Sequence, residues 1–158
     1  MKCFILPWVC CIVGGILCSI VVVILNRAIN QARRTRCALN LRDLSEAGDA
    51  YAMQRRHWLS SRGDHLWTDL SKTDPPLIAA AEILRCPVRH EDFESGQTDY
   101  RGPLEDATRL KPDAPLGADK VGNHGAEEGG NVLLKSGNIL HYEKRDPLWK
   151  QCAVKLAP

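Results

Sequence analysis

The residues best suited to chemistry lie in one segment, NHGAEEGGNVLLKSGNILHY, at positions 123–142. His124, Glu127 and Glu128 offer an imidazole and two carboxylates, which could bind a metal ion or act as a general base with acidic partners. His141 could complete such a set. However, the spacing of the two histidines matches none of the common zinc motifs. Glycine-flanked acidic residues before a hairpin are usually solvated, so we expect a polar loop with no catalytic or metal-binding role.

The remaining motifs do not indicate an enzyme either. The pair Gly129 and Gly130 precedes a β-rich run, whereas a phosphate-binding loop continues as GK[ST] into a helix. No serine lies in the sequence context of a nucleophile elbow. The seven cysteines include no CxxC pair, which disfavours zinc. We therefore predict no catalytic residue, no metal, no other cofactor and no small-molecule substrate.

The elements that must position these residues begin with an apolar N-terminal block. After a short flank at residues 1–3, residues 4–25 carry no charge. As a helix this block spans roughly 33 Å, enough for a hydrocarbon core of about 30 Å. A cleavable secretory signal is disfavoured, because no small-x-small cleavage site follows residue 21. We predict a single-pass transmembrane segment at residues 4–25, with the lipid bilayer as its partner.

The chain continues beyond this block without a helix breaker. Small or apolar residues recur at steps of four, three, four and three, at Cys37, Leu41, Leu44, Gly48 and Tyr51. This is the spacing of one helical face. We predict one long helix from about residue 8 to about residue 53. Its amphipathic continuation, residues 26–56, would pack on a small globular domain formed by residues 57–158.

The globular part combines turns with short elements. We predict a short helix at residues 76–84, then an irregular region at 89–123 with one short strand near 99–101. Residues 131–134 and 139–142 are β-rich and are separated by KSGN, which predicts a hairpin. The fold class is therefore α+β, with a long N-terminal helix packed on a small antiparallel sheet with long irregular loops.

Charge gives information on partners and orientation. The net charge of +2 and an aromatic content of 6% give no support for nucleic-acid binding. Arginines follow the apolar block at positions 27, 33, 34 and 36. Taken alone, the positive-inside rule would place these arginines, and the bulk of the chain, in the cytoplasm.

Several short motifs follow the apolar helix in a fixed order, namely RRTRC, CP, YRG, NHG and GNVL. In this order they resemble bacterial type IV pilin-like (pseudopilin-like) proteins with a prepilin-type processing-associated signature, which is a His, nine residues and Asp-Gly. The resemblance covers most of the chain and implies structural roles for the matching residues. These are Arg33, Arg34, Cys37, Cys86, Pro87, Tyr100, Arg101, Gly102, Asn123, His124, Gly130, Asn131 and Gly137.

The resemblance also implies a function and a location. It implies a non-enzymatic, single-pass inner-membrane protein, structural or accessory, related to type II secretion or type IV pilus-like assemblies. Other pilin-like subunits would pack against its N-terminal helix. The C-terminal domain would face away from the cytoplasm, opposite to the arginine rule. Disulfides form in such a compartment, and we predict one between Cys86 and Cys152, because Cys37 lies on the long helix.

The sequence departs from the family at both ends. Ser136 replaces the signature aspartate, and two extra residues separate it from His124. Trp8 stands where a prepilin carries glutamate, and Cys3 stands where the peptidase requires glycine. We therefore expect an unprocessed protein. One alternative is a membrane-anchored binding or sensor domain that reuses the scaffold, and a less favoured one is a metal-binding or hydrolytic domain.

Overall fold

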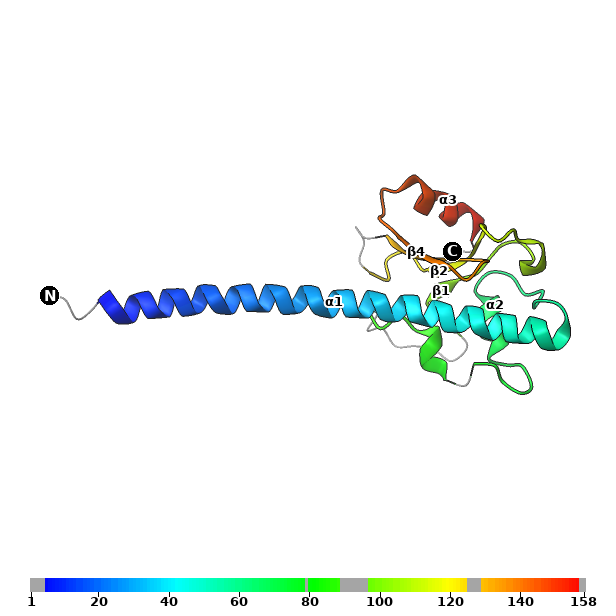
Figure 1. Cartoon of the computed structure of the whole chain (residues 1–158), viewed down its shortest axis with the longest axis horizontal. Coiled ribbons are helices and arrows are strands. Elements are labelled where there is room, and N and C mark those ends of the chain that lie inside the picture. Colours follow the sequence, from blue (N-terminus) through cyan, green and yellow to red (C-terminus); the bar gives the residue numbers. More distant parts are fainter. Residues whose placement is uncertain (1–4, 79, 89–96, 125–128, 157–158) are drawn as a thin grey trace. The chain divides into compact units, whose positions relative to one another are not determined.

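The computed structural model describes residues 5–78, 80–88, 97–124 and 129–156. The chain forms two compact units, Met1–Ala32 and Arg33–Pro158. Helix α1 (Ile5–Arg55) contributes to both units, which confirms the prediction of one long helix (Figure 1). The second unit begins inside α1, because every described side chain from 13 to 32 is exposed and burial starts at Arg33.

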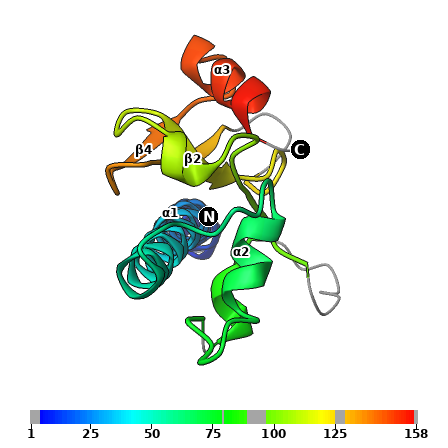
Figure 2. The same cartoon turned by 90° about the vertical axis from the view of Figure 1, so that its right-hand side faces the viewer.

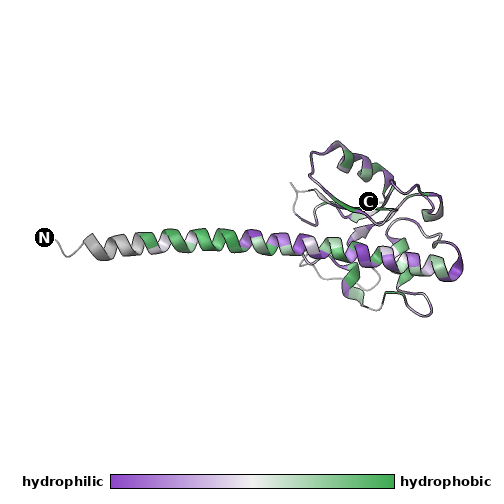
Figure 3. Cartoon of the chain, viewed as in Figure 1, coloured by the Kyte–Doolittle hydropathy of each residue, from purple (hydrophilic) through white to green (hydrophobic). Residues whose placement is uncertain are grey.

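In the first unit, α1 is mainly apolar up to Leu25 and carries polar residues from Asn26 onward (Figure 3). Its large apolar side chains are about half exposed or more, at Val13, Ile16, Leu17, Ile20, Val21, Val22, Val23, Ile24, Leu25 and Ile29. The helix is long and apolar enough to cross a membrane. The hydroxyl of Ser19 donates a hydrogen bond to the carbonyl oxygen of Gly15 at 2.5 Å, so its polar group is satisfied within the helix.

In the second unit, α1 is amphipathic, as its spacing predicts. The stripe formed by Cys37, Leu41, Leu44 and Gly48 is buried, and Tyr51 is half-buried. The charged residues beside this stripe are exposed, at Arg36, Arg42, Asp43, Glu46 and Asp49. The same helix therefore changes from a mainly apolar helix to an amphipathic one. Figure 3 shows polar and apolar residues mixed along its second half.

A four-stranded antiparallel sheet in sequential order packs on this stripe. Its strands are β1 (Tyr100–Arg101), β2 (Pro115–Asp119), β3 (Gly130–Leu134) and β4 (Ile139–Tyr142). The predicted hairpin and the short strand near residue 100 are confirmed, and so is the α+β fold. Strand β2 lies in the region predicted to be irregular. Its proline and glycine hide the strand pattern, and a register shift between Pro115 and Gly117 interrupts its alternation.

The short helices differ from the predictions. They are α2 (His65–Leu70), η1 (Ala81–Leu84), η2 (Ala107–Arg109) and α3 (Pro147–Lys155). The predicted helix at 76–84 is reduced to the 3-10 turn η1, because the backbone of Ala80 is extended. Helix α3 was not predicted, although Asp146 caps its first turn and Pro147 occupies its first position, both of which are start signals.

The sheet separates the core into two clusters. On one side, α1 and α2 pack against Leu116 and Leu133; on the other, α3 packs against Ala118 and Val132. Figure 2 shows α1 and α2 on one side of the sheet and α3 on the opposite side. The second unit is therefore a three-layer arrangement in which the sheet lies between helices.

Gly48 supports a testable prediction about this packing. The indole ring of Trp58 lies where a Cβ at position 48 would be, so Gly48→Ala forces the ring out of the core. Alanine favours an isolated helix by about 1 kcal/mol over glycine, yet we expect the domain to lose about 1–3 kcal/mol from overpacking. Thermal unfolding followed by near-UV circular dichroism should show a melting temperature several degrees lower.

The control for this prediction is Gly14→Ala, because a Cβ at position 14 would meet nothing within 4 Å. This variant should leave the unfolding transition of the domain unchanged. An unchanged transition in Gly48→Ala would contradict the packing described here.

Candidate functional site

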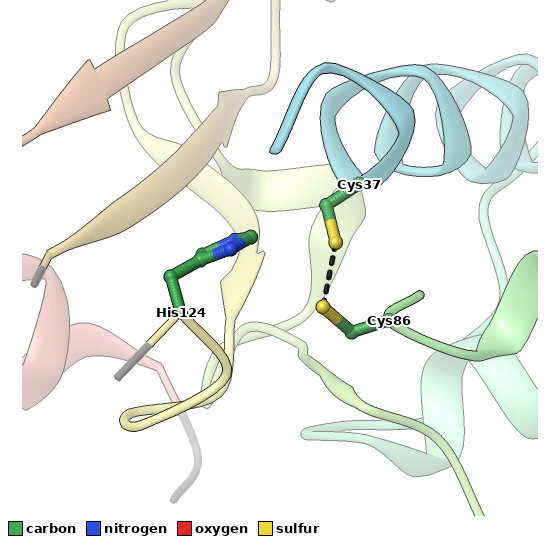
Figure 4. Close-up of side chains that lie close together, drawn as sticks. All are labelled: Cys37, Cys86 and His124. Carbon is green, nitrogen blue, oxygen red and sulfur yellow. Dashed lines mark hydrogen bonds between the residues drawn. The ribbon is translucent and has the colours of Figure 1, made fainter. Parts of the chain in front are cut away.

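Chemically capable side chains gather inside the second unit, where three segments meet. Cys37 comes from α1, Cys86 follows η1, and His124 follows β2 (Figure 4). Their ligand atoms lie within 4.8 Å of one another, and all three residues are buried. Of the residues that sequence analysis singled out, these three are brought together, although their positions are far apart in the chain.

The two cysteines are in direct contact. Their Sγ atoms lie 2.6 Å apart in a buried environment. This contact raises the pKa of the Cys37 thiol, and burial raises it further. For Cys86 the same contact acts in the opposite direction and lowers its pKa.

The structure places Cys86 beside Cys37 and not beside Cys152, with which a bridge was predicted. Cys86 belongs to the core cluster on the α1 side of the sheet, whereas Cys152 belongs to the cluster under α3. Because the sheet lies between the two clusters, Cys86 contacts Cys37 instead. The prediction excluded Cys37 because it lies on the long helix, but one face of that helix, including Cys37, is part of the core.

His124 forms a buried pair with Asp119, the last residue of β2. Its Nε2–H donates to Asp119 Oδ2 at 2.8 Å, and the same oxygen accepts from the backbone N–H of Asn131 at 2.8 Å. Burial lowers the pKa of His124, but the hydrogen bond and charge of Asp119 outweigh it, so that the net shift is upward. Sequence analysis missed Asp119, because β2 was not predicted and the contact depends on where that strand ends.

The asparagines of the signature join the surrounding segments. Asn131 Nδ2 donates to the carbonyl oxygen of Arg34 at 3.2 Å, which fixes β3 to α1. Asn123 Nδ2 donates to the carbonyl oxygen of Asp99 at 2.8 Å. The carboxylate of Asp99 accepts the backbone N–H of Cys86 at 2.9 Å. These bonds hold the segments that carry Cys86 and His124 in place.

The three residues of the YRG motif, Tyr100, Arg101 and Gly102, each contact a segment distant in the sequence. Tyr100 donates its hydroxyl to the carbonyl oxygen of Arg85 at 3.1 Å, and the Arg101 guanidinium donates to that of Leu156 at 2.9 Å. Gly102 packs so closely on the backbone of Gly63 that a Cβ would overlap it.

The other signature residues are placed as follows. Gly130 packs under Trp149, and Gly137 has a φ of 83° in the hairpin turn. Arg33 and Pro87 are half-buried.

The His–Glu set considered first does not gather in the part of the chain that is described. His141 is exposed on β4, and its Nδ1 contacts Asn131 Oδ1 at 3.2 Å. Glu127 and Glu128 lie outside the described residues. The histidine that does gather with other groups, His124, faces two sulfurs and a carboxylate that the sequence segment does not contain.

The chemistry open to this cluster is limited by its burial. Cys37 and Asp119 are 0% exposed, Cys86 is 1% and His124 is 8%. A substrate cannot reach these side chains in this structure. The Nδ1 atom of His124 is buried without a hydrogen-bond partner. The arrangement suits a thiol redox pair or a structural ligand set.

Comparison of the chain with protein-family models, with curated proteins and with solved structures finds no match. The architecture itself is pilin-like, because a long apolar N-terminal helix precedes a small four-stranded antiparallel sheet.

The His124–Asp119 pair predicts a pH dependence. Because the folded-state pKa of His124 is raised above 6.5, its protonated form stabilises the fold. This stabilisation is complete below about pH 6.5 and is lost as the pH rises through the folded pKa. We expect the unfolding free energy of the wild type to fall over that range, measured by denaturant titration at several pH values.

His124→Gln should remove this slope, because glutamine does not titrate. His65→Gln is the matched control, since His65 is exposed, and it should keep the slope. A wild-type slope that persists in His124→Gln would assign the pH dependence to another group.

Proposed function

We propose that this protein is a non-enzymatic, membrane-anchored, pilin-like (pseudopilin-like) protein. The single observation that supports this most is the change in α1 at residue 33. Before it, the described side chains from 13 to 32 are all exposed, and most are apolar. A helix that is apolar on all sides is stable inside lipid or among other helices. After residue 33, one face of the same helix is the core of a domain.

The anchor suits a lipid environment because its polar groups, like its length, match what the hydrocarbon layer requires. A helix satisfies its backbone hydrogen bonds internally, as the hydrocarbon layer requires. Ser19, the polar side chain in its middle, bonds to Gly15 one turn earlier. Gly14 and Gly15 leave open space at their Cα atoms, which suits close packing of a second helix. Other pilin-like subunits are therefore the proposed protein partners, next to the lipid bilayer.

We place the domain on the extracytoplasmic side of a bacterial inner membrane. This orientation rests on the pilin-like arrangement and the signature motifs, and it runs against the arginines at the end of the apolar block. The role would be structural or accessory, in an assembly related to type II secretion or type IV pili. Cys3 stands where prepilin processing needs glycine, and Trp8 stands where pilins carry the glutamate used in assembly, which favours an anchored, unprocessed protein.

The anchor is tested by charging its surface. Ile16→Arg combined with Leu17→Arg, near the middle of the span, adds about 2.5–3.5 kcal/mol per arginine to the cost of insertion. We expect the wild type to stay in the membrane pellet after carbonate extraction, and the double variant to appear in the soluble fraction or to fail to insert. Val154→Arg is the control, since Val154 is 77% exposed on α3, and it should stay in the pellet. Release of the wild type by carbonate would refute the anchor.

The orientation is tested with one added thiol. Ser136→Cys places it in the exposed hairpin turn, whereas Cys37, Cys86 and Cys152 are buried. A membrane-impermeant maleimide should add one label to this variant in intact spheroplasts, relative to the wild type treated identically. Labelling only after lysis would place the domain in the cytoplasm and contradict the proposed orientation.

A further inference from the structure

We propose that Cys37 and Cys86 form an internal disulfide that joins α1 to the segment following η1. The proposal assigns both the pair and its place in the fold, in contrast to the bridge predicted from the sequence. It depends on the proposed extracytoplasmic placement in one respect only, because that compartment supplies the oxidant. The pairing itself rests on the geometry of the second unit.

Three observations favour this pair. The sulfurs lie 2.6 Å apart, whereas heavy atoms that only touch lie about 3.5–4.0 Å apart. Both residues are fixed by their surroundings, because Cys37 is on a buried helix face and the N–H of Cys86 is bound by the Asp99 carboxylate. The third cysteine of the domain, Cys152, lies across the sheet.

The competing interpretation is a metal site with His124 as third ligand. A zinc ion bound to two thiolates by bonds of about 2.3 Å, at a tetrahedral angle, holds the sulfurs about 3.8 Å apart. The sulfurs here are more than 1 Å closer than that, so a metal would have to push α1 and the Cys86 segment apart. His124 could bind a metal only through Nδ1, because its Nε2 is hydrogen-bonded to Asp119.

The oxidation can be written with a disulfide as oxidant, either a protein disulfide or a small-molecule one. The Cys86 thiolate attacks one sulfur of the oxidant, so that a mixed disulfide forms and a thiolate leaves. Cys37 then loses its proton and attacks Sγ of Cys86, which expels the second thiolate of the oxidant. Two thiols of the protein are oxidised, one external disulfide is reduced, and the two protons end on the released thiols. Because both sulfurs are buried in the finished domain, this exchange belongs to folding, before α1 closes over Cys86.

The bridge would close a large loop of the chain. Cys37 and Cys86 are 49 positions apart, and the segment between them contains the packed half of α1, α2 and η1. Cross-links that close long loops restrict the unfolded chain more than those that close short ones. The effect of the bridge on stability should therefore be measurable.

The test uses the full-length protein, collected from membranes in an alkylating agent that blocks free thiols. Trypsin places the three domain cysteines in separate peptides, CALNLR (37–42), CPVR (86–89) and QCAVK (151–155). Mass spectrometry without reduction should find CALNLR linked to CPVR, and QCAVK alkylated. A link between CPVR and QCAVK would overturn the proposal, and alkylation of all three would show that the bridge is absent in the cell, which the refolding measurement below then resolves. Alkylated thiols together with one zinc per chain in elemental analysis would assign the cluster as a metal site.

Variants provide an independent readout. Reductant should lower the melting temperature of the wild type by on the order of 10 °C, because the chain loses its cross-link. The control Cys152→Ala should respond as the wild type does, whereas Cys37→Ala should melt at the same temperature with and without reductant. Equal responses of Cys37→Ala and the wild type would overturn the proposal. If Cys37→Ala does not fold, the peptide analysis of the wild type decides alone.

One further measurement separates this proposal from the proposed orientation. Reduced, denatured protein is refolded with glutathione disulfide and analysed by the same peptides. If protein from membranes carries free thiols but refolded protein links CALNLR to CPVR, the bridge is absent in the cell because the domain does not meet an oxidant. The proposed extracytoplasmic placement is then at fault. If refolded protein forms no such link, the pairing is wrong whatever the orientation.

Discussion

The buried stripe of α1 is the constraint on which the rest of the domain depends. Leu41 and Leu44 are fully buried, and Gly48 lets the ring of Trp58 lie directly on the helix. Strands β2 and β3 are buried along nearly their whole length, so both faces of the sheet need a covering layer. The helix supplies the apolar surface on which it forms, and α3 covers the opposite face. The domain therefore depends on the second half of α1 for its core.

Polar contacts set the register of this packing. Apolar contacts between a helix and a sheet tolerate sliding, whereas hydrogen bonds to single atoms do not. Asn131 on β3 binds a carbonyl oxygen of α1, and Asn40 on α1 donates to the carbonyl oxygen of Arg85 at 2.9 Å. The buried His124–Asp119 pair joins the end of β2 to the loop that leads toward β3. The residues of the NHG and GNVL motifs thus act as positioning groups for backbone segments.

The sequence was most informative where a pattern is local. The 3.6-residue period of α1 and the alternation around KSGN each depend on a few consecutive residues, and both elements formed as predicted. It was least informative where structure depends on distant partners. Strand β2 contains Pro115 and Gly117, and the space around Gly117 is filled by Trp67, which is 50 positions earlier in the chain. The same limit applies to Cys37 and Cys86, which are 49 positions apart. Asp119 is only five positions from His124, and it was missed because strand β2 was not predicted.

The position of Cys37 has a mechanical consequence. If α1 anchors the protein in a bilayer as proposed, a partner that pulls on the domain puts tension on α1. The carbonyl of Arg34 and the sulfur of Cys37 meet the domain in the first turns of the packed half of α1. A load arriving along the helix is passed to β3 and to the Cys86 segment at that point. The apolar contacts of Leu41, Leu44 and Gly48 lie beyond that point, so they do not separate one after another under the load.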